Sequence, residues 1–327
     1  MEKRKYLVTG GTGFIGSALV RRLVKDGHDV RVADNDLRGS RQRLADVLPS
    51  IKLFACDVRD ADALTEASKG CDSILHLAAL NGTENFYNRP DLVLDVGIRG
   101  MYGALEAAKR NRITEFVLAS SSEAYQTPPV VPTPENVPLT IPDPWNPRYS
   151  YGGSKLISEI MLANYHRDLF KKAIIFRPHN VYGSDMGWEH VIPQLVLRAR
   201  EQIEKHPTGT VPFEIQGDGS QTRSFVHIDD FIDGLVLLID KGAHRNVYHI
   251  GTGDEITIRR LVEIIFAWFG REPKLVSTPL PAGGTLRRCP DIRKLEALGY
   301  APRIDVAKGI AEVAAWYVAH ADRKPTG

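Results

Sequence analysis

The chain has 327 residues, a length that predicts one large domain or two mid-sized ones in contact. Hydrophobic residues make up 43% of it and charged residues 25%, as in an ordinary soluble globular protein. The 42 basic and 40 acidic side chains almost cancel, so the charge argues against nucleic acid or an anionic membrane as a partner.

Targeting and metal-binding signals are not expected. Apolar runs stay short of the roughly 20 residues that span a bilayer, and no secretory signal is recognised at the N-terminus. The cysteines Cys56, Cys71 and Cys289 are scattered and lack the spacing of a zinc site or a disulfide framework. We therefore expect a cytoplasmic protein without a metal.

The first half alternates short β-branched runs with longer amphipathic segments. Strands are predicted at residues 6–9, 30–33, 52–55, 73–77, 116–119 and 174–176, and helices from residue 14 to Gly27, at 92–110 and at 151–169. Repeated strand–helix–strand units imply right-handed crossovers. The predicted fold class is therefore α/β, with a Rossmann-type doubly wound parallel sheet.

The second half loses this rhythm. Prolines crowd residues 128–147, which predicts a long irregular loop over the surface. Later helices are expected at 189–205, 229–241, 257–269 and 306–319. We expect the Rossmann domain to comprise residues 1–180, and residues 181–327 to form a smaller mixed α/β lobe against its strand ends.

A glycine-rich turn, Thr9-Gly-Gly-Thr-Gly-Phe-Ile-Gly16, lies between the first predicted strand and helix. Glycines permit close backbone approach to a pyrophosphate, and the helix N-terminus offers N–H groups to it. Asp34 at the tip of the second strand suits the ribose hydroxyls of NAD and repels a 2′-phosphate. Arg38 and Arg41, just behind it, keep NADP open. The turn residues expected to touch the cofactor are Gly10, Gly13, Phe14, Ile15 and Gly16.

The carboxyl ends of parallel strands line the crevice of such a sheet. This places further cofactor contacts at Asn35, Asp57, Val58, Leu77, Ala78, Ala79 and Pro178. Asp57 is placed at the adenine edge. Small side chains at 78 and 79 would let the cofactor lie close, although helix–sheet packing explains them nearly as well.

Tyr151 and Lys155 are i, i+4 neighbours on one face of a predicted helix. An ammonium beside a phenol is expected to lower the phenol pKa, which makes Tyr151 an acid–base candidate. Ser121 ends the fifth strand, where its hydroxyl can bind the alcohol that Tyr151 deprotonates. Alternatively, the serine cluster 120–122 is a turn or a helix cap.

These motifs together resemble one family. The set comprises the glycine turn, Asp34, His76-Leu-Ala-Ala79, the serine cluster, Tyr151-Gly-Gly-Ser-Lys155, and the segments 177–183, 217–230 and 248–253. In this order, over nearly the whole chain, the set is similar to the extended short-chain dehydrogenase/reductase superfamily, in its nucleotide-sugar epimerase/dehydratase branch.

The resemblance implies tightly held NAD, and removal and return of a hydride at C4 of a sugar. Ser121 and Tyr151 would handle the 4-hydroxyl, and Lys155 would hold the nicotinamide ribose. Asn180 and Arg223 would contact the diphosphate of a nucleotide sugar, most simply a UDP-sugar. The helices at about 92–110 and 152–169 would pair across a two-fold axis as a homodimer.

Three reactions remain open once C4 is a ketone: 4-epimerisation, 4,6-dehydration and decarboxylation. Glu123 is typical of dehydratases and uronate decarboxylases, and Ser122 takes the place where dTDP-glucose dehydratases carry Asp. Arg148, three residues before Tyr151, and Arg288 in Arg288-Cys-Pro-Asp-Ile292 are similar to UDP-glucuronate decarboxylases. An arginine there would grip the sugar carboxylate.

We therefore favour a UDP-glucuronate decarboxylase-like enzyme. A 4-epimerase and a 4,6-dehydratase are its main alternatives, and an NADPH-dependent carbonyl reductase or a non-catalytic NAD sensor would use the same fold. The segment that contains Arg287 and Arg288 has two further interpretations. Either one of these arginines lies over the diphosphate, or the segment is a solvated basic turn.

Overall fold

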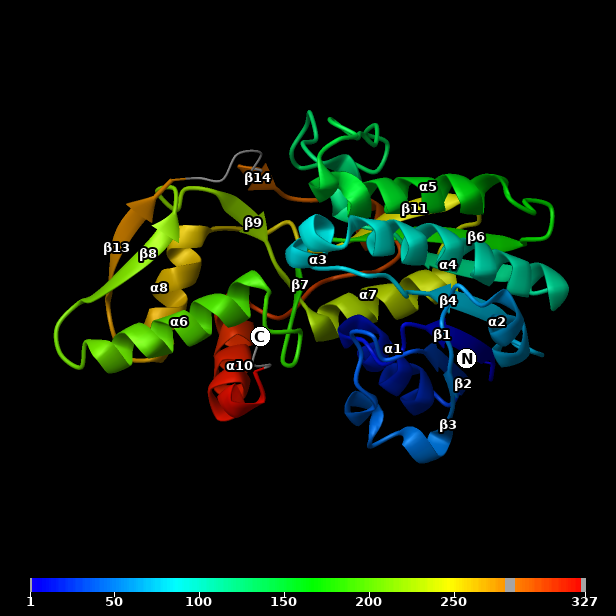
Figure 1. Ribbon diagram of the computed structural model, residues 1–327, viewed down its shortest axis with the longest axis horizontal. Helices are drawn as coiled ribbons and strands as arrows, with labels where there is room; N and C mark the ends of the chain where they lie inside the picture. Colours follow the sequence, from blue (N-terminus) through cyan, green and yellow to red (C-terminus); the bar gives the residue numbers. More distant parts are fainter. Residues whose placement is uncertain (1, 280–285, 325–327) are drawn as a thin grey trace.

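The computed structural model describes residues 2–279 and 286–324 and centres on a seven-stranded parallel sheet (Figure 1). Its strands are β1 (Lys5–Thr9), β2 (Asp29–Asp34), β3 (Ile51–Ala55), β4 (Ser73–His76), β5 (Glu115–Ala119), β6 (Lys172–Pro178) and β11 (Asn246–Ile250). The spatial order is β11-β6-β5-β4-β1-β2-β3, and every neighbouring pair is parallel. The predicted doubly wound α/β fold is confirmed.

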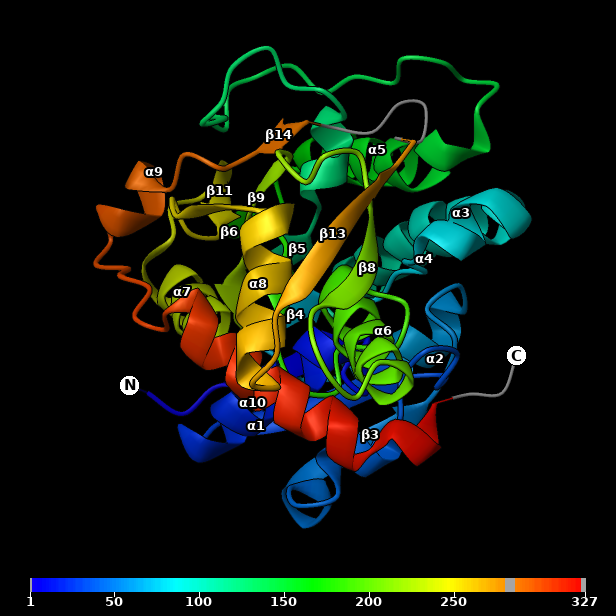
Figure 2. The same cartoon turned by 90° about the vertical axis from the view of Figure 1, so that its left-hand side faces the viewer.

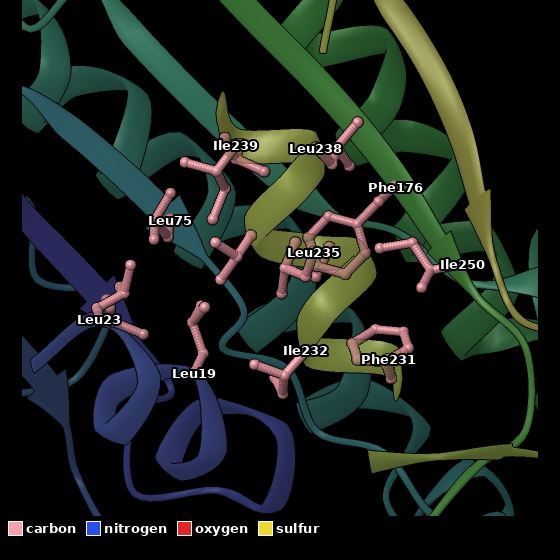
Figure 3. Close-up of a cluster of buried hydrophobic side chains, with 14 of the residues drawn as sticks. Leu19, Leu23, Leu75, Phe176, Phe231, Ile232, Leu235, Leu238, Ile239 and Ile250 are labelled. Carbon is pink, nitrogen blue, oxygen red and sulfur yellow. The ribbon is translucent and has the colours of Figure 1, made fainter. Parts of the chain in front are cut away.

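Helices cover both faces of this sheet, so its strands are buried on both sides, as is usual for parallel sheets. Within β1, Val8 faces the cluster formed with α1 (Phe14–Lys25) and α7 (Ile228–Lys241), whereas Leu7 faces the cluster formed with α4 (Pro90–Arg110) and α5 (Ser150–Asn164). Figure 3 shows the first cluster, in which Leu19, Leu235 and other aliphatic side chains fill the space between helices and strands. The covering helices are α1 (Phe14–Lys25), α2 (Ala61–Ala67), α3 (Thr83–Asn88), α4 (Pro90–Arg110), α5 (Ser150–Asn164) and α7 (Ile228–Lys241).

A smaller lobe with its own core lies at one end of the molecule, on the left in Figure 1 and facing the viewer in Figure 2. Strand β8 alternates buried and exposed residues, so one of its faces packs against the lobe's helices. The lobe contains α6 (Val191–Lys205), α8 (Ile258–Trp268), α10 (Val306–Ala319), β8 (Val211–Gln216) and β13 (Pro273–Thr278). Short elements connect it to the sheet: β7 (Val181–Tyr182), β9 (Thr222–Ser224), β10 (Val226–His227), β12 (Glu255–Thr257), β14 (Arg287–Arg288) and α9 (Arg293–Glu296).

The chain after residue 180 also returns to the main sheet, which the sequence did not reveal. Strand β11 pairs with β6 at the sheet edge, and α7 packs beside α1. Another difference concerns α5, which ends at Asn164 rather than at residue 169. Tyr165 is extended and His166 adopts a φ of 48°, so the chain turns away toward β6.

Residues 128–147 form the expected irregular loop. Across residues 2–279 and 286–324, none of the helices combines the length and apolar character needed to cross a bilayer.

Candidate active site

A cleft of about 610 Å³ opens between the carboxyl ends of the strands and the smaller lobe. Residues predicted from the sequence lie on both sides of this cleft. This agrees with a doubly wound fold, in which ligands bind outside the carboxyl ends of the strands. Its walls include every residue predicted to touch the cofactor: Gly10, Gly13, Phe14, Ile15, Gly16, Asp34, Asn35, Asp57, Val58, Leu77, Ala78, Ala79, Tyr151, Lys155 and Pro178. Ser121, Ser122, Glu123, Asn180 and Arg288 also line it.

The glycine turn is shaped for close approach of backbone to a ligand. Gly10 has a φ of 72°, and a Cβ there would lie 2.8 Å from the Cα of Ala78. A Cβ on Gly16 would lie 2.1 Å from the carbonyl oxygen of Gly10. Because Gly13 caps α1 without a side chain, the first turn of the helix faces the cleft directly. This geometry fits a dinucleotide pyrophosphate.

Acidic and amide groups of β2 and β3 form the adenosine end of the cleft. The Asp34 carboxylate accepts hydrogen bonds from the backbone N–H of Thr12 at 3.0 Å and of Asp36 at 2.9 Å, which fixes its position. Asn35 donates to Asp57 at 2.9 Å. Hydrogen bonds from Arg59 are the main reason that the pKa of Asp57 is lowered. Asp57 is therefore held as an oriented anion, and the ordered carboxylate of Asp34 suits ribose hydroxyls.

Tyr151, Ser121 and Lys155 come together as predicted, but their electrostatics differ from the prediction. Burial raises the pKa of Tyr151 to about 12, against a lowering influence of its hydrogen bond with Ser121. Lys155 does not offset this rise, since its Nζ donates to the carbonyl of Ala119 at 2.7 Å and lies 5.7 Å from the centre of the Tyr151 ring. Burial also lowers the pKa of Lys155 to about 8, although Glu159 acts to raise it. The expected low phenol pKa is therefore wrong for the chain by itself.

Phe86 is a contact that sequence reasoning missed. Its ring lies 5.1 Å from that of Tyr151, with only 13° between the two planes. Phe86 belongs to the short helix α3, where it stands beside a second aromatic residue, Tyr87, and neither is part of a motif. The stacked rings fix the orientation of the phenol.

Guanidinium groups surround Glu123. Arg288 forms an ion pair with it, and their side chains are 10% and 27% exposed respectively. Burial acts to raise the pKa of Glu123, but Arg288, Arg148 and Arg223 outweigh burial and lower it. Arg148 and Arg223 lie near this carboxylate without lining the main cleft. The site thus brings three cations to one carboxylate.

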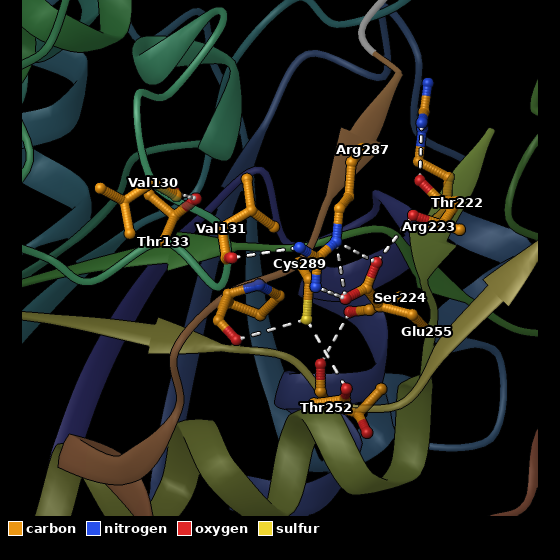
Figure 4. A network of polar contacts seen from close by, with 12 residues as sticks. Val130, Val131, Thr133, Thr222, Arg223, Ser224, Thr252, Glu255, Arg287 and Cys289 are labelled. Atoms are coloured by element: carbon orange, nitrogen blue, oxygen red, sulfur yellow. Dashed lines mark hydrogen bonds and ion pairs between the residues drawn. The ribbon is translucent and has the colours of Figure 1, made fainter.

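Strand alternation explains why Arg288 points inward. Its neighbour Arg287 points to the other side of β14, where Nε lies 2.8 Å from Oε2 of Glu255 (Figure 4). Glu255 also accepts from the hydroxyl of Thr222 at 2.7 Å. Because successive residues of a strand face opposite sides, this outer pair directs Arg288 toward the cleft. The sequence left open whether Arg287 or Arg288 would face the ligand, and of these two it is Arg288 that lines the cleft.

The long loop holds the residues that directly follow β14. Thr133 accepts a backbone hydrogen bond from Asp291 at 2.8 Å and donates one to Cys289 at 2.9 Å. Arg287 donates to the carbonyl of Val131 at 3.2 Å (Figure 4). The loop of residues 128–147 therefore helps to place Arg288.

A buried ion pair lies behind the reactive residues. Arg177 donates to Glu159 through Nε at 2.8 Å and Nη2 at 2.6 Å, with side chains 4% and 8% exposed. Ser120, next to Ser121, donates to the same carboxylate, and Arg177 donates to the Tyr125 hydroxyl. The pair was not predicted, although Glu159 follows Lys155 by one helical turn. It connects α5 with the ends of β5 and β6.

Asn180 lines the cleft from the start of the second half of the chain. Its side-chain amide donates to the carbonyl of Ser224 at 2.9 Å, and its φ is 40°. This places Asn180 beside the strand that carries Arg223.

Fold and site together define a class: a doubly wound dinucleotide-binding protein in which a Ser–Tyr–Lys set lines the cleft beside a smaller lobe. The family model described as "NAD dependent epimerase/dehydratase family" matches residues 6–251. The chain belongs to this family. Its members are NAD-dependent enzymes, and NAD is the cofactor that the cleft fits.

Relatives within the family carry out different reactions. A putative UDP-glucose 4-epimerase of Methanocaldococcus jannaschii is 31% identical over 95% of this chain and 97% of its own length. UDP-glucuronic acid decarboxylase 1 of Arabidopsis thaliana is 30% identical over 94% of this chain and 68% of its own. The structure of a dTDP-glucose 4,6-dehydratase from Streptomyces venezuelae, with NAD bound, superposes with a TM-score of 0.85 at 30% identity, covering 98% of both chains.

Proposed function

We propose that the chain is a UDP-glucuronate decarboxylase-like enzyme, which oxidises C4 of a nucleotide-sugar uronate transiently and releases its carboxylate as CO₂. The observation that carries this proposal is the Arg288–Glu123 ion pair inside the cleft. A guanidinium that already holds one carboxylate has the shape and charge to hold the carboxylate of a uronate.

The charge around Glu123 supports an anionic sugar. With Arg148, Arg223 and Arg288 near it, the group has a formal surplus of two positive charges over one carboxylate. A nucleotide diphosphate would neutralise part of this surplus, and a sugar carboxylate would take the place of Glu123 on Arg288. Glu123, displaced from Arg288, would then be a free base beside the sugar.

The reactive residues have distinct roles in this proposal. NAD, when bound, supplies reversible acceptance of the hydride from sugar C4. Tyr151 takes the proton of the 4-hydroxyl and returns it, while Ser121 holds that hydroxyl. Because burial raises the pKa of Tyr151 to about 12, a nearby cation must favour the phenolate, and Arg38 acts in that direction. Lys155 anchors the ribose.

Loss of CO₂ follows from the ketone at C4. The bond from C5 to the carboxylate breaks, and its electron pair moves into an enolate on the C4 oxygen. A proton taken up from solvent then adds to C5 and regenerates the C4 ketone. Return of the hydride to C4, with the proton that Tyr151 gives back, restores the 4-hydroxyl. The chain's contribution is to bind the carboxylate through Arg288 and to protonate and deprotonate oxygen through Tyr151.

We further propose a homodimer built from α4 and α5. Both helices expose large apolar side chains, among them Leu94, Tyr102, Ile157 and Ile160. Such a stripe suits burial against a second copy across a two-fold axis. The three cysteines are free thiols, which supports a cytoplasmic location.

The test is to incubate the purified protein with UDP-glucuronate and to follow the nucleotide sugar by mass spectrometry. The expected product lacks CO₂, and Arg288→Ala is expected to abolish its formation while Arg293→Ala, an exposed neighbour paired with Asp291, retains it. An unchanged or merely isomerised sugar would overturn the proposal.

A 4,6-dehydratase is the second candidate, because the lowered pKa of Glu123 keeps it ionised as that reaction's C5 base requires. Loss of water from dTDP-glucose or UDP-glucose, with UDP-glucuronate untouched, would select it. A 4-epimerase would invert the configuration at C4 and leave the mass of the nucleotide sugar unchanged.

A further inference from the structure

Three arginines, Arg38, Arg41 and Arg43, follow β2 in the segment that leads to β3, and they have different surroundings. Arg41 donates through Nε to Asp36 at 2.6 Å. Arg43 forms a forked pair with Asp185 of the opposite lobe, through Nε at 2.8 Å and Nη2 at 3.0 Å. These two side chains are thus engaged by carboxylates.

The third arginine, Arg38, lines the cleft instead. Its Nη1 lies so close to Gly82 that an added Cβ there would be 2.8 Å away. Within residues 2–279 and 286–324, no side chain or carbonyl forms a hydrogen bond or ion pair with it. Glu189 and Tyr151 influence it electrostatically across the cleft, and Arg43 repels it. Arg38 therefore presents its donors to the cleft interior.

The loop that carries Arg38 is fixed at both ends. Thr12 of the glycine turn donates to Asp36 at 3.0 Å, and Ser40 donates its backbone N–H to Thr12 at 3.0 Å. Arg43 approaches the carbonyl of Thr12 at 3.4 Å while it holds Asp185. The position of Arg38 is therefore tied to the turn that cradles phosphate, and less entropy is lost when it binds.

We propose that Arg38 binds a diphosphate in the cleft with its guanidinium fork. A guanidinium matches two phosphate oxygens at once, and an arginine at the edge of a cleft without a carboxylate partner can offer both donors of its fork to such a ligand. Two ligands carry this chemistry: the dinucleotide cofactor and the nucleotide sugar. The second rests on the proposed function, whereas the first rests on family membership alone.

Because Arg38 follows Asp34 closely in the sequence, it was a candidate for binding the 2′-phosphate of NADP. Its guanidinium is directed to Gly82 and Glu189, toward Tyr151, rather than held beside the Asp34 carboxylate. Arg41 is occupied by Asp36. The two arginines therefore do not form a 2′-phosphate pocket next to Asp34, and the phosphates that Arg38 serves are those of the diphosphate.

The experiment compares Arg38→Ala and Arg38→Lys with the matched control Arg41→Ala, in the full-length protein as purified. One arm measures the exchange rate of bound NAD against isotopically labelled NAD by mass spectrometry. The other arm measures UDP binding by calorimetry on the same samples. Thermal melting checks that each variant is folded.

Loss of one charge-assisted contact should change binding by about 10- to 100-fold. Faster NAD exchange in Arg38→Ala alone assigns the cofactor diphosphate, weaker UDP binding alone assigns the nucleotide sugar, and both together assign a contact shared by the two. Arg38→Lys should fall between, because it keeps the charge and loses the fork.

Unchanged NAD exchange and unchanged UDP binding in Arg38→Ala would overturn the inference. The inference would also be overturned if Arg41→Ala changed NAD exchange and UDP binding as much as Arg38→Ala does. Such a result would reflect the total positive charge of this segment rather than a contact made by Arg38. If wild-type protein binds no UDP, the proposed substrate fails while the NAD arm still decides the role of Arg38.

Discussion

Changing Glu159 to glutamine tests whether the buried ion pair holds the site together. In the wild-type protein the carboxylate accepts from Arg177 through both oxygens, at 2.8 Å and 2.6 Å, and also from Ser120. Glutamine keeps the shape but directs an NH₂ group at one of these donors and leaves the Arg177 charge without a counter-ion. Breaking such a buried pair typically costs about 3–5 kcal/mol.

That loss is a large fraction of the roughly 5–15 kcal/mol by which domains are stable. Urea unfolding at pH 7 measures it, with Glu204→Gln as the control. Glu204 is 63% exposed and pairs with Arg200 one helical turn away, so its change should cost no more than about 0.5 kcal/mol. The double variant Glu159→Leu/Arg177→Met removes both charges and should recover much of the loss.

A second readout is the pKa of Lys155, which Glu159 acts to raise. In Glu159→Gln the pKa of Lys155 should therefore fall below its wild-type value of about 8. Glu159→Gln losing no more stability than Glu204→Gln would refute the claim that the pair is structurally important.

Other changes have equally definite outcomes. Gly16→Ala places a Cβ 2.1 Å from the Gly10 carbonyl, so NAD content after gel filtration should fall at least about 10-fold. Gly153→Ala meets only Ile141 at 3.6 Å and should raise the unfolding free energy by up to about 1 kcal/mol, and a loss would contradict the open space seen there. Because burial lowers the Lys155 pKa to about 8, the unfolded chain binds the extra proton between about pH 8 and 10.5, and this group makes stability rise with pH there. Lys155→Met should abolish that rise in paired urea titrations.

Much of the fold follows from residue patterns. The parallel strands before residue 180 are short runs rich in apolar and β-branched residues, and the helices between them have amphipathic periods. Strand β11 was not predicted because its five residues include a buried histidine, His249, and because the strand with which it pairs, β6, is far away in sequence. Long-range pairing of a short strand leaves little local signal.

Part of the site was predictable because the topology of the sheet and the geometry of a helix fix where its residues lie. Residues at strand ends, such as Asp34 and Ser121, are placed by topology, and the i, i+4 pair of Tyr151 and Lys155 by helix geometry. The pKa of Tyr151 depends on how deeply the whole fold buries it, which local spacing does not encode. Phe86 was missed because a stacked ring has no motif.

The most direct test of the central claim uses UDP-glucuronate carrying deuterium at C4, incubated with purified protein and no added cofactor. If the hydride leaves C4 and returns to the same sugar, the product will have lost CO₂ and retained the deuterium at C4. Loss of the deuterium, or formation of one NADH for each product molecule, would contradict the account.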